Sequence, residues 1–363
     1  MEQWRLSWKS APIGMRRVRL GLALMCTLAA NLPARAQATE PTQHEGYLLG
    51  AVFAQGRVWM LSNAGFLSSI EPHGDKRPRE GLPERALDLC VSNGQPAVIT
   101  AGNGTWNFRR RHDESWTIVA TVSDDGDDIK AMHCGNEATL VLTSTRLIEL
   151  DTKGVARIAK LSGEPLDVHH VSDMYDEGKS LLLAIDDGEF GGGIRRVDKF
   201  TGAVTMLPRV SKDWKLDPRS LALIPVHGFT MEPWNSRCVA LAAGLAHMFM
   251  EQGRIVEVCG DTLRTIYEKP YSTTLSIRKL ESNLDRTVAF YGVTESDGTL
   301  WAIGKDDIYR IDASGKATPY APPAYTNVDG VDVSFDNPAF VLLVAVFDQG
   351  PLTNRALPML VPR

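Results

Sequence analysis

One stretch of the sequence decides the fold: Thr299-Leu300-Trp301-Ala302-Ile303-Gly304-Lys305-Asp306-Asp307-Ile308-Tyr309-Arg310-Ile311-Asp312-Ala313-Ser314-Gly315-Lys316. It consists of an apolar strand, an Asp turn, a second apolar strand and a D-x-x-G-like turn. The same pattern returns about every 40 to 50 residues along the chain, which is the length of a four-stranded propeller blade. Because such a unit cannot bury both faces alone, its copies must pack against one another. The sequence therefore predicts an all-β fold.

The repeat predicts one ring with no second domain. Copies of the pattern occur at about 47–83, 84–123, 124–163, 164–215, 216–270, 271–323 and 324–363. These seven units favour a single β-propeller of seven four-stranded blades over residues 47–363, although six or eight blades would also fit the spacing. We expect one blade to combine strands from both termini, because this closes the ring without a free sheet edge.

The N-terminus has the features of an export signal. Residues 1–36 hold a basic segment, an apolar run of 11 residues from Leu20 to Ala30, and a small-x-small cleavage site at Ala34-Arg35-Ala36. The apolar run is too short for a permanent membrane span. We therefore expect cleavage after Ala36, a flexible leader at 37–46, and a periplasmic or secreted protein with no transmembrane anchor after cleavage.

Export changes the charge of the mature chain. Residues 1–36 contain six basic and one acidic side chains, which leaves 33 basic and 43 acidic residues and a formal net charge of −10. Nucleic-acid binding depends on Lys and Arg neutralising phosphates, so this surface argues against a nucleic-acid partner. An anionic membrane surface is disfavoured for the same reason.

Four cysteines remain after cleavage: Cys90, Cys134, Cys238 and Cys259. In an oxidising compartment an even number favours up to two disulfides, with four buried thiols as the alternative. Cys90 and Cys134 lie one blade period apart, so they should occupy similar places on neighbouring inner strands. Strands at 238–242, 247–250 and 255–258 would put Cys238 and Cys259 at opposite ends of one blade, which conflicts with a disulfide between them.

Two units resemble known propeller families. Asp297-Gly298-Thr299-Leu300-Trp301, followed by Ile308-Tyr309-Arg310-Ile311-Asp312, resembles the repeats of bacterial two-component-regulator sensor propellers. Residues 110–119 are similar to sialidase-type repeats but lack the Ser-x-Asp-x-Gly-x-x-Trp box. These resemblances imply an exported propeller fold and transfer no catalytic residue.

Carboxylates gather where an up-and-down blade places its top face, in the links between blades and the turns between second and third strands. They are Asp124, Asp125, Asp127, Asp128, Asp186, Asp187, Glu189, Asp306, Asp307 and Asp348. The longest of these turns, 186–193, carries three carboxylates and four glycines. Clustered oxygens on such a loop suit Ca²⁺, so Asp186, Asp187 and Glu189 are candidate calcium or ligand-binding residues. A solvated loop with glycines at positive φ is the alternative.

Histidines and loop tryptophans are further candidates. His133, His169, His170 and His227 fall on or near inner strands of three consecutive units, where imidazoles could form a metal or general-base site. Alternation along a strand would send His169 and His170 to opposite faces, so only one could point inward. Trp214 and Trp234 lie in polar stretches and could stack on a ligand or anchor an interface, or be partly covered loop residues.

The leading functional hypothesis is a non-enzymatic, monomeric exported propeller that binds a partner protein or a small cationic or carbohydrate ligand through its acidic top face. No G-x-S-x-G, H-E-x-x-H or paired C-x-x-C motif is present. Their absence argues against a hydrolase with a nucleophile elbow, a zinc metalloprotease and a zinc-ribbon protein. A metal-dependent lactonase-like or lyase-like enzyme and an envelope sensor or assembly-factor scaffold are the alternatives.

Overall fold

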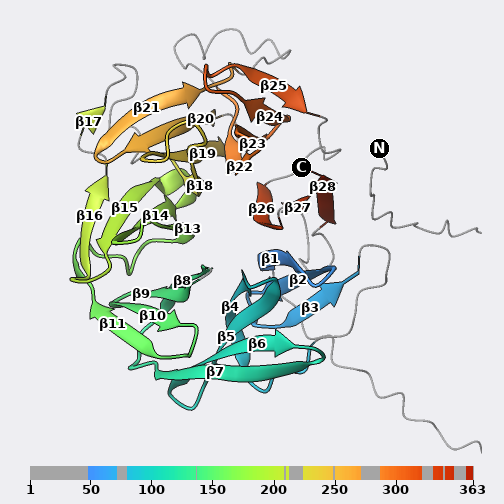
Figure 1. The fold of residues 1–363 in the computed structure, drawn as a ribbon, viewed down its shortest axis with the longest axis vertical. Coiled ribbons are helices and arrows are strands. Elements are labelled where there is room, and N and C mark those ends of the chain that lie inside the picture. The colour runs from blue at the N-terminus through green and yellow to red at the C-terminus, as the bar shows by residue number, and fades with distance from the viewer. Residues whose placement is uncertain are drawn as a thin grey trace, which may run out of the picture.

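A computed structural model describes residues 48–71, 80–135, 137–207, 210–211, 224–247, 250–270, 287–320, 330–337, 340–346 and 357–362. Their strands form seven sheets arranged in a ring (Figure 1), so the predicted all-β, seven-bladed propeller is confirmed. The expected signal peptide 1–36 and leader 37–46 lie outside the described residues, as do Trp214 and Asp348.

The blades follow one another in chain order. Blades one to three comprise β1 (Leu48–Ala54), β2 (Arg57–Ser62) and β3 (Leu67–Ile70); β4 (Arg85–Ser92), β5 (Gln95–Gly102), β6 (Thr105–His112) and β7 (Ser115–Ser123); and β8 (Ile129–Cys134), β9 (Ala138–Thr143), β10 (Arg146–Asp151) and β11 (Ala156–Lys160). Blade four comprises β12 (Ser162–Gly163), β13 (Val171–Asp176), β14 (Ser180–Asp186), the single-turn 3₁₀ helix η1 (Gly188–Phe190), β15 (Gly192–Asp198) and β16 (Ala203–Leu207). Blade five comprises β17 (Val210–Ser211), β18 (Val226–Met231), β19 (Val239–His247), β20 (Met250–Cys259) and β21 (Thr262–Tyr267). Blades six and seven comprise β22 (Phe290–Ser296), β23 (Thr299–Gly304), β24 (Ile308–Ile311) and β25 (Ala317–Tyr320); and β26 (Gly330–Asn337), β27 (Phe340–Val346) and β28 (Leu357–Pro362).

Within each blade the long strands form an antiparallel meander whose first long strand is innermost. Blades four and five gain a short parallel strand at the outer edge, because β12 pairs with β16 and β17 with β21. Blades one and seven each show three strands. We expected one blade to combine strands from both termini, but no sheet of the described residues does so. The ring closes instead through an apolar core between these two blades, which includes Phe53, Met60 and Leu342.

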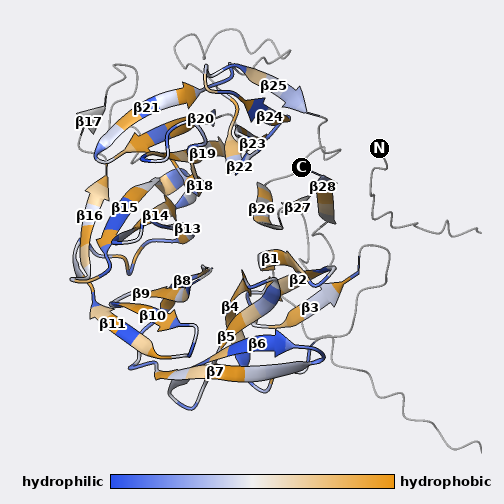
Figure 2. Cartoon of the chain, viewed as in Figure 1, coloured by the Kyte–Doolittle hydropathy of each residue, from blue (hydrophilic) through white to orange (hydrophobic). Residues whose placement is uncertain are grey.

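The hydrophobic core lies between neighbouring blades. Figure 2 shows hydrophobic residues along middle strands such as β9 and β14, and Leu181 to Ile185 of β14 are fully buried. Trp59 and Trp301 are also buried, as the packing of twisted sheets requires. Trp116 packs edge-on against Trp59, with ring centroids 5.8 Å apart.

The described residues form two disulfides, one between neighbouring blades and one within blade five. Cys90 on β4 pairs with Cys134 on β8, and this confirms the expectation for neighbouring inner strands. Cys238 pairs with Cys259, so the sequence-based objection to this disulfide is wrong. Residues 239–247 and 250–259 form two long strands rather than three short ones, and antiparallel pairing sets Val239 opposite Val258, which brings the flanking cysteines together.

Candidate functional site

A cavity of about 1610 Å³ occupies the centre of the ring and is lined by the innermost strands of all seven blades. Six of these strands contain a β-bulge near their start, which leaves one residue unpaired and turns its side chain. The unpaired residues are Leu49, Leu87, Lys130, Ser172, His227 and Tyr291, and all six line the cavity. A repeated backbone irregularity therefore selects the side chains that face the channel.

The lining is acidic. Seven aspartates contribute to it, namely Asp88, Asp124, Asp127, Asp128, Asp167, Asp173 and Asp186. Among the described residues, Arg85 and Lys130 are the two cationic side chains of the lining, together with four histidines. In a concave site with low-dielectric walls, such an imbalance concentrates a negative potential.

The innermost strands all begin at one face of the ring, here called the top face. The link 124–128 and the turns 186–192 and 304–308 lie at this face, because they join strand ends that pair with the starts of the innermost strands. This agrees with the placement expected from an up-and-down blade. Asp306 there accepts hydrogen bonds from Lys269 and Tyr309, each 2.7 Å long.

Asp186 joins two blades. It ends β14 of blade four, and its Oδ2 lies 3.3 Å from Nδ1 of His227 on β18 of blade five. The Nε2 of His227 lies 2.7 Å from the carbonyl oxygen of Gly244. Burial acts to raise the pKa of Asp186, but the hydrogen bond and charge of His227 outweigh it and hold this pKa below its ordinary value. Asp186 is therefore a carboxylate at neutral pH.

Asp187 contacts two further histidines, His169 and His170. These two histidines, His227, Asp186 and Asp187 are here called the histidine cluster. Oδ2 of Asp187 lies 2.7 Å from Nδ1 of His169, and Oδ1 accepts the backbone N–H of His170 at 3.0 Å. Both histidines precede β13 and both line the cavity, so the alternation expected of a strand does not apply to them. Glu189 lies exposed on η1. Calcium binding by Asp186, Asp187 and Glu189 stays a prediction.

The remaining candidates lie apart from this cluster. His133 lines the cavity near the end of β8, whereas His227 lies near the start of β18. Trp234 is half-buried and packs against the core between blades five and six, near the buried carboxyl group of Glu232. Next to the histidine cluster, Val168 and Phe190 are 73% and 87% exposed.

Two aspartates that sequence reasoning missed act as braces between blades. Asp173 accepts the backbone N–H of Met174 at 2.8 Å and that of Phe229, in the next blade, at 2.9 Å. Asp88 holds the equivalent place in blade two and accepts the N–H groups of Leu89 and Met132. Burial raises the pKa of Asp88 to about 7 in spite of these bonds. No motif marks these residues, because their role depends on the bulge beside them.

Tyr291 was also missed. Its ring packs at a tilt against His227, with centroids 5.6 Å apart. Burial, with the nearby charges of Glu251 and Asp186, raises the pKa of its hydroxyl above the ordinary value of 10.0. Tyr291 is therefore a neutral hydroxyl beside the Asp186 carboxylate.

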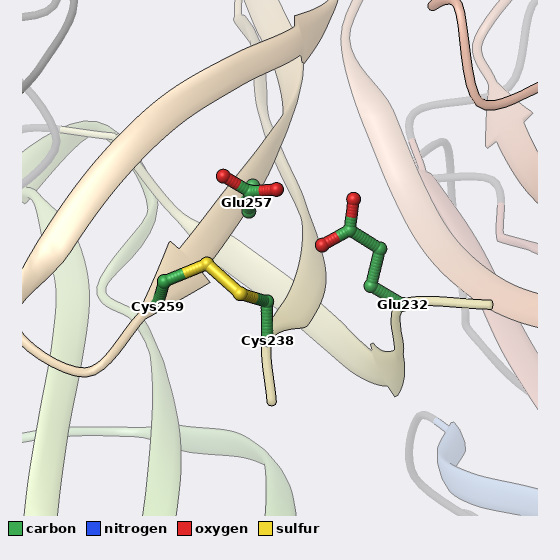
Figure 3. Close-up of side chains that lie close together, drawn as sticks. All are labelled: Glu232, Cys238, Glu257 and Cys259. Carbon is green, nitrogen blue, oxygen red and sulfur yellow. A yellow bond between two sulfur atoms is a disulfide. The ribbon is translucent and has the colours of Figure 1, made fainter. Parts of the chain in front are cut away.

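A second cluster lies at the opposite face, in blade five. Glu232, Cys238, Glu257 and Cys259 place their potential ligand atoms within 4.8 Å of one another (Figure 3). Glu257 accepts two hydrogen bonds from Arg264, at 3.0 and 2.8 Å. Burial and the adjacent Glu257 carboxyl group raise the pKa of Glu232 to about 7. In the sequence, besides the two cysteines, the only signal near this place was Trp234, which lies in a polar stretch.

Comparisons with known proteins bear on the fold. No protein-family model matches the chain, and no curated protein sequence does. Similar solved structures include the extracellular domain of the putative one-component system BT4673 from B. thetaiotaomicron, at 9% identity over 88% of this chain and 38% of that chain, with a TM-score of 0.48. BamB from Moraxella catarrhalis matches at 13% identity over 87% of this chain and 83% of that one, with a TM-score of 0.45.

PorZ, a surface component of the type-IX secretion system of Porphyromonas gingivalis, matches at 14% identity over 88% of this chain and 38% of that chain, with a TM-score of 0.47. The likeness is one of fold. BT4673 is also described as a putative hybrid two-component system. Within the described residues, no helix is long and apolar enough to cross a membrane.

Proposed function

We propose that the protein is an exported binding propeller whose acidic channel mouth takes a basic segment of a partner polypeptide. The observation that carries this proposal is the acidic cavity, in which seven aspartates outnumber two cationic side chains. A volume of about 1610 Å³ exceeds the roughly 300 to 1000 Å³ typical of small-molecule sites, which favours a polypeptide segment over a small cation.

Exposed apolar side chains beside the cavity support a protein partner. Val168 directly precedes His169 and lines the cavity, and Phe190 lies in η1, which directly follows Asp187. Large exposed apolar residues next to a charged surface are typical of interface anchors. The partner segment should therefore combine Lys or Arg with an apolar residue that covers Phe190.

The cellular location follows from the export signal expected in residues 1–36 and belongs to this proposal. Two disulfides support an oxidising compartment such as the periplasm or the exterior. An envelope sensor or an assembly-factor scaffold would use the same top face in the same way.

The test uses a fluorescent oligo-arginine peptide as the probe and an oligo-glutamate peptide as the control. We expect the mature protein to bind oligo-arginine, with an affinity that falls as the salt concentration rises, and to show no binding of oligo-glutamate. Equal binding of both peptides, or binding of neither, contradicts the proposal.

A second candidate is a metal-dependent enzyme at the same mouth. The observation that favours it is the meeting of His169, His170 and His227 with two adjacent carboxylates. Calorimetric titration with Zn²⁺, which suits imidazole and carboxylate ligands, should show heat of binding and a raised melting temperature if this candidate holds. The absence of both would remove it.

A further inference from the structure

The cluster at the bottom of blade five contains a fully buried carboxyl group. Glu232 is 0% exposed, and neither of its carboxylate oxygens makes a hydrogen bond of ordinary geometry, although the Glu257 carboxyl and the Trp234 indole are near enough to shift its pKa. Nη2 of Arg264 lies 3.8 Å from its Oε1. Two neighbouring carboxyl groups of which one is fully buried are costly to ionise together, so the position calls for either a proton or a cation.

The surroundings of Glu232 supply ligands for such a cation. Glu232 directly follows β18, Cys238 directly precedes β19, and Glu257 and Cys259 lie on β20. The backbone N–H of Glu232 bonds to the carbonyl of Cys238 at 3.0 Å, which fixes the loop between them. Asn235 Nδ2 donates to the sulfur of Cys238 at 2.9 Å, and Arg264 holds Glu257. Contacts of this kind orient ligands around bound metals.

We propose that reduction of the Cys238–Cys259 disulfide creates a zinc site formed by Cys238, Cys259, Glu232 and Glu257. Tetrahedral zinc binds sulfur at about 2.3 Å and oxygen at about 2.1 Å, which puts its ligand atoms about 3.6 Å apart. The four ligand atoms already lie within 4.8 Å of one another. The two sulfurs are bonded to each other in the disulfide, so they must separate to the distance that zinc requires, and reduction allows this. Two thiolates with two carboxylates suit Zn²⁺ rather than Ca²⁺ or Mg²⁺, which take oxygen ligands.

The chemistry balances with a dithiol as reductant. Thiol–disulfide exchange breaks the Cys238–Cys259 bond and oxidises the dithiol to its own disulfide, leaving two protein thiols. Zn²⁺ then displaces the two thiol protons, together with any proton that Glu232 holds. Two thiolates, two carboxylates and Zn²⁺ leave a net charge of −2, which Arg264 partly offsets. In the oxidised protein the disulfide closes the site.

The test uses the mature chain, with Co²⁺ as a spectroscopic stand-in for Zn²⁺ and a phosphine as the reductant. We expect the reduced protein to bind one Co²⁺ per chain with a thiolate charge-transfer band that Zn²⁺ abolishes, and the oxidised protein to show no band. The control Cys90→Ser/Cys134→Ser removes the other disulfide and should keep the band. Cys238→Ser/Cys259→Ser should lose it.

Glu232→Gln separates this site from binding by cysteines alone. It keeps both sulfurs and the size of the side chain, and it should weaken Co²⁺ binding at least about tenfold. Its oxidised form should melt no lower than the wild type, because it replaces a fully buried carboxyl group that lies beside the Glu257 carboxyl with a neutral amide of the same size. The proposal is overturned by a reduced protein without a thiolate band, by a band that survives Cys238→Ser/Cys259→Ser, or by unchanged affinity in Glu232→Gln. Unfolding on reduction that Zn²⁺ does not prevent overturns it as well.

Discussion

Nδ1 of His227 lies 3.3 Å from Oδ2 of Asp186 across the junction between blades four and five. The contact depends on the bulge at Val226/Gly228, which leaves His227 unpaired and facing the channel. Because Asp186 belongs to blade four and His227 to blade five, a change in the charge of either side chain should alter the contact between the two blades.

Asp186→Asn tests this coupling. The folded pKa of Asp186 lies below its ordinary 3.8, so its contribution to the free energy of unfolding is present above about pH 4 and is lost as the pH falls through the folded pKa. We expect a loss of about 1 to 2 kcal/mol at pH 7 that shrinks at lower pH, measured by urea denaturation. Asp261→Asn, which removes an exposed partner of Arg196, should cost less than about 0.5 kcal/mol.

Asp88→Asn tests the raised pKa of the brace in blade two. Asp88 titrates near 3.8 when unfolded and at about 7 when folded, so the folded state holds its proton more tightly. The free energy of unfolding of the wild type should therefore fall as the pH rises from about 4 to 7. Glu232 contributes to the same fall, so the informative quantity is the difference between variant and wild type. The free energy of unfolding of Asp88→Asn should rise relative to that of the wild type across this range. Parallel pH profiles of the two proteins would refute the raised pKa of Asp88.

Gly202→Ala should be far more harmful than Gly94→Ala. Both glycines have φ of +73°, so both substitutions incur a cost of about 1 kcal/mol for the left-handed conformation. A Cβ at Gly202 would lie 2.0 Å from the carbonyl oxygen of Lys160, whereas nothing lies within 4 Å at Gly94. We expect Gly202→Ala to cost at least about 2 kcal/mol more in thermal or urea unfolding. Equal losses would show that the contact between Gly202 and Lys160 is not tight.

The two disulfides should differ in their effect on stability. Loop-closure entropy predicts losses of about 4 kcal/mol for Cys90→Ser/Cys134→Ser and about 3 kcal/mol for Cys238→Ser/Cys259→Ser, because the pairs are separated by 44 and 21 residues. Thiol titration of the denatured, unreduced mature protein should find no free thiol. A count of four would contradict both pairings.

The sequence predicts the ring well and the channel poorly. The spacing of Cys90 and Cys134 by one blade period correctly places them on neighbouring inner strands. The strands expected at 238–242, 247–250 and 255–258 left Gly244 and Gly253 between strands, yet both lie inside strands. Glycine is required at both places because the backbone of Val288 to Phe290 leaves no room for a Cβ. This error in the strand boundaries hid the Cys238–Cys259 disulfide.

The channel lining could not be predicted because it depends on bulges. A bulge shifts which residue faces inward, and no residue type marks it in Leu49, Lys130, Ser172 or Tyr291. His169 and His170 could not be placed for a related reason. Both line the cavity from a link rather than a strand, so strand alternation does not apply to them.

The central claim is that the acidic top face binds a basic polypeptide segment, and one comparison of charge variants tests it most directly. Asp128 and Asp167 are exposed at the channel mouth, whereas Asp113 and Asp297 are exposed in turns at the opposite face. Asn tolerates the positive φ of the latter two, so each pair loses the same charge without backbone strain. The measurement is the fluorescence anisotropy of labelled oligo-arginine with each double variant. The account predicts that Asp128→Asn/Asp167→Asn weakens binding several-fold while Asp113→Asn/Asp297→Asn leaves it close to the wild type, and equal effects of the two pairs would contradict it.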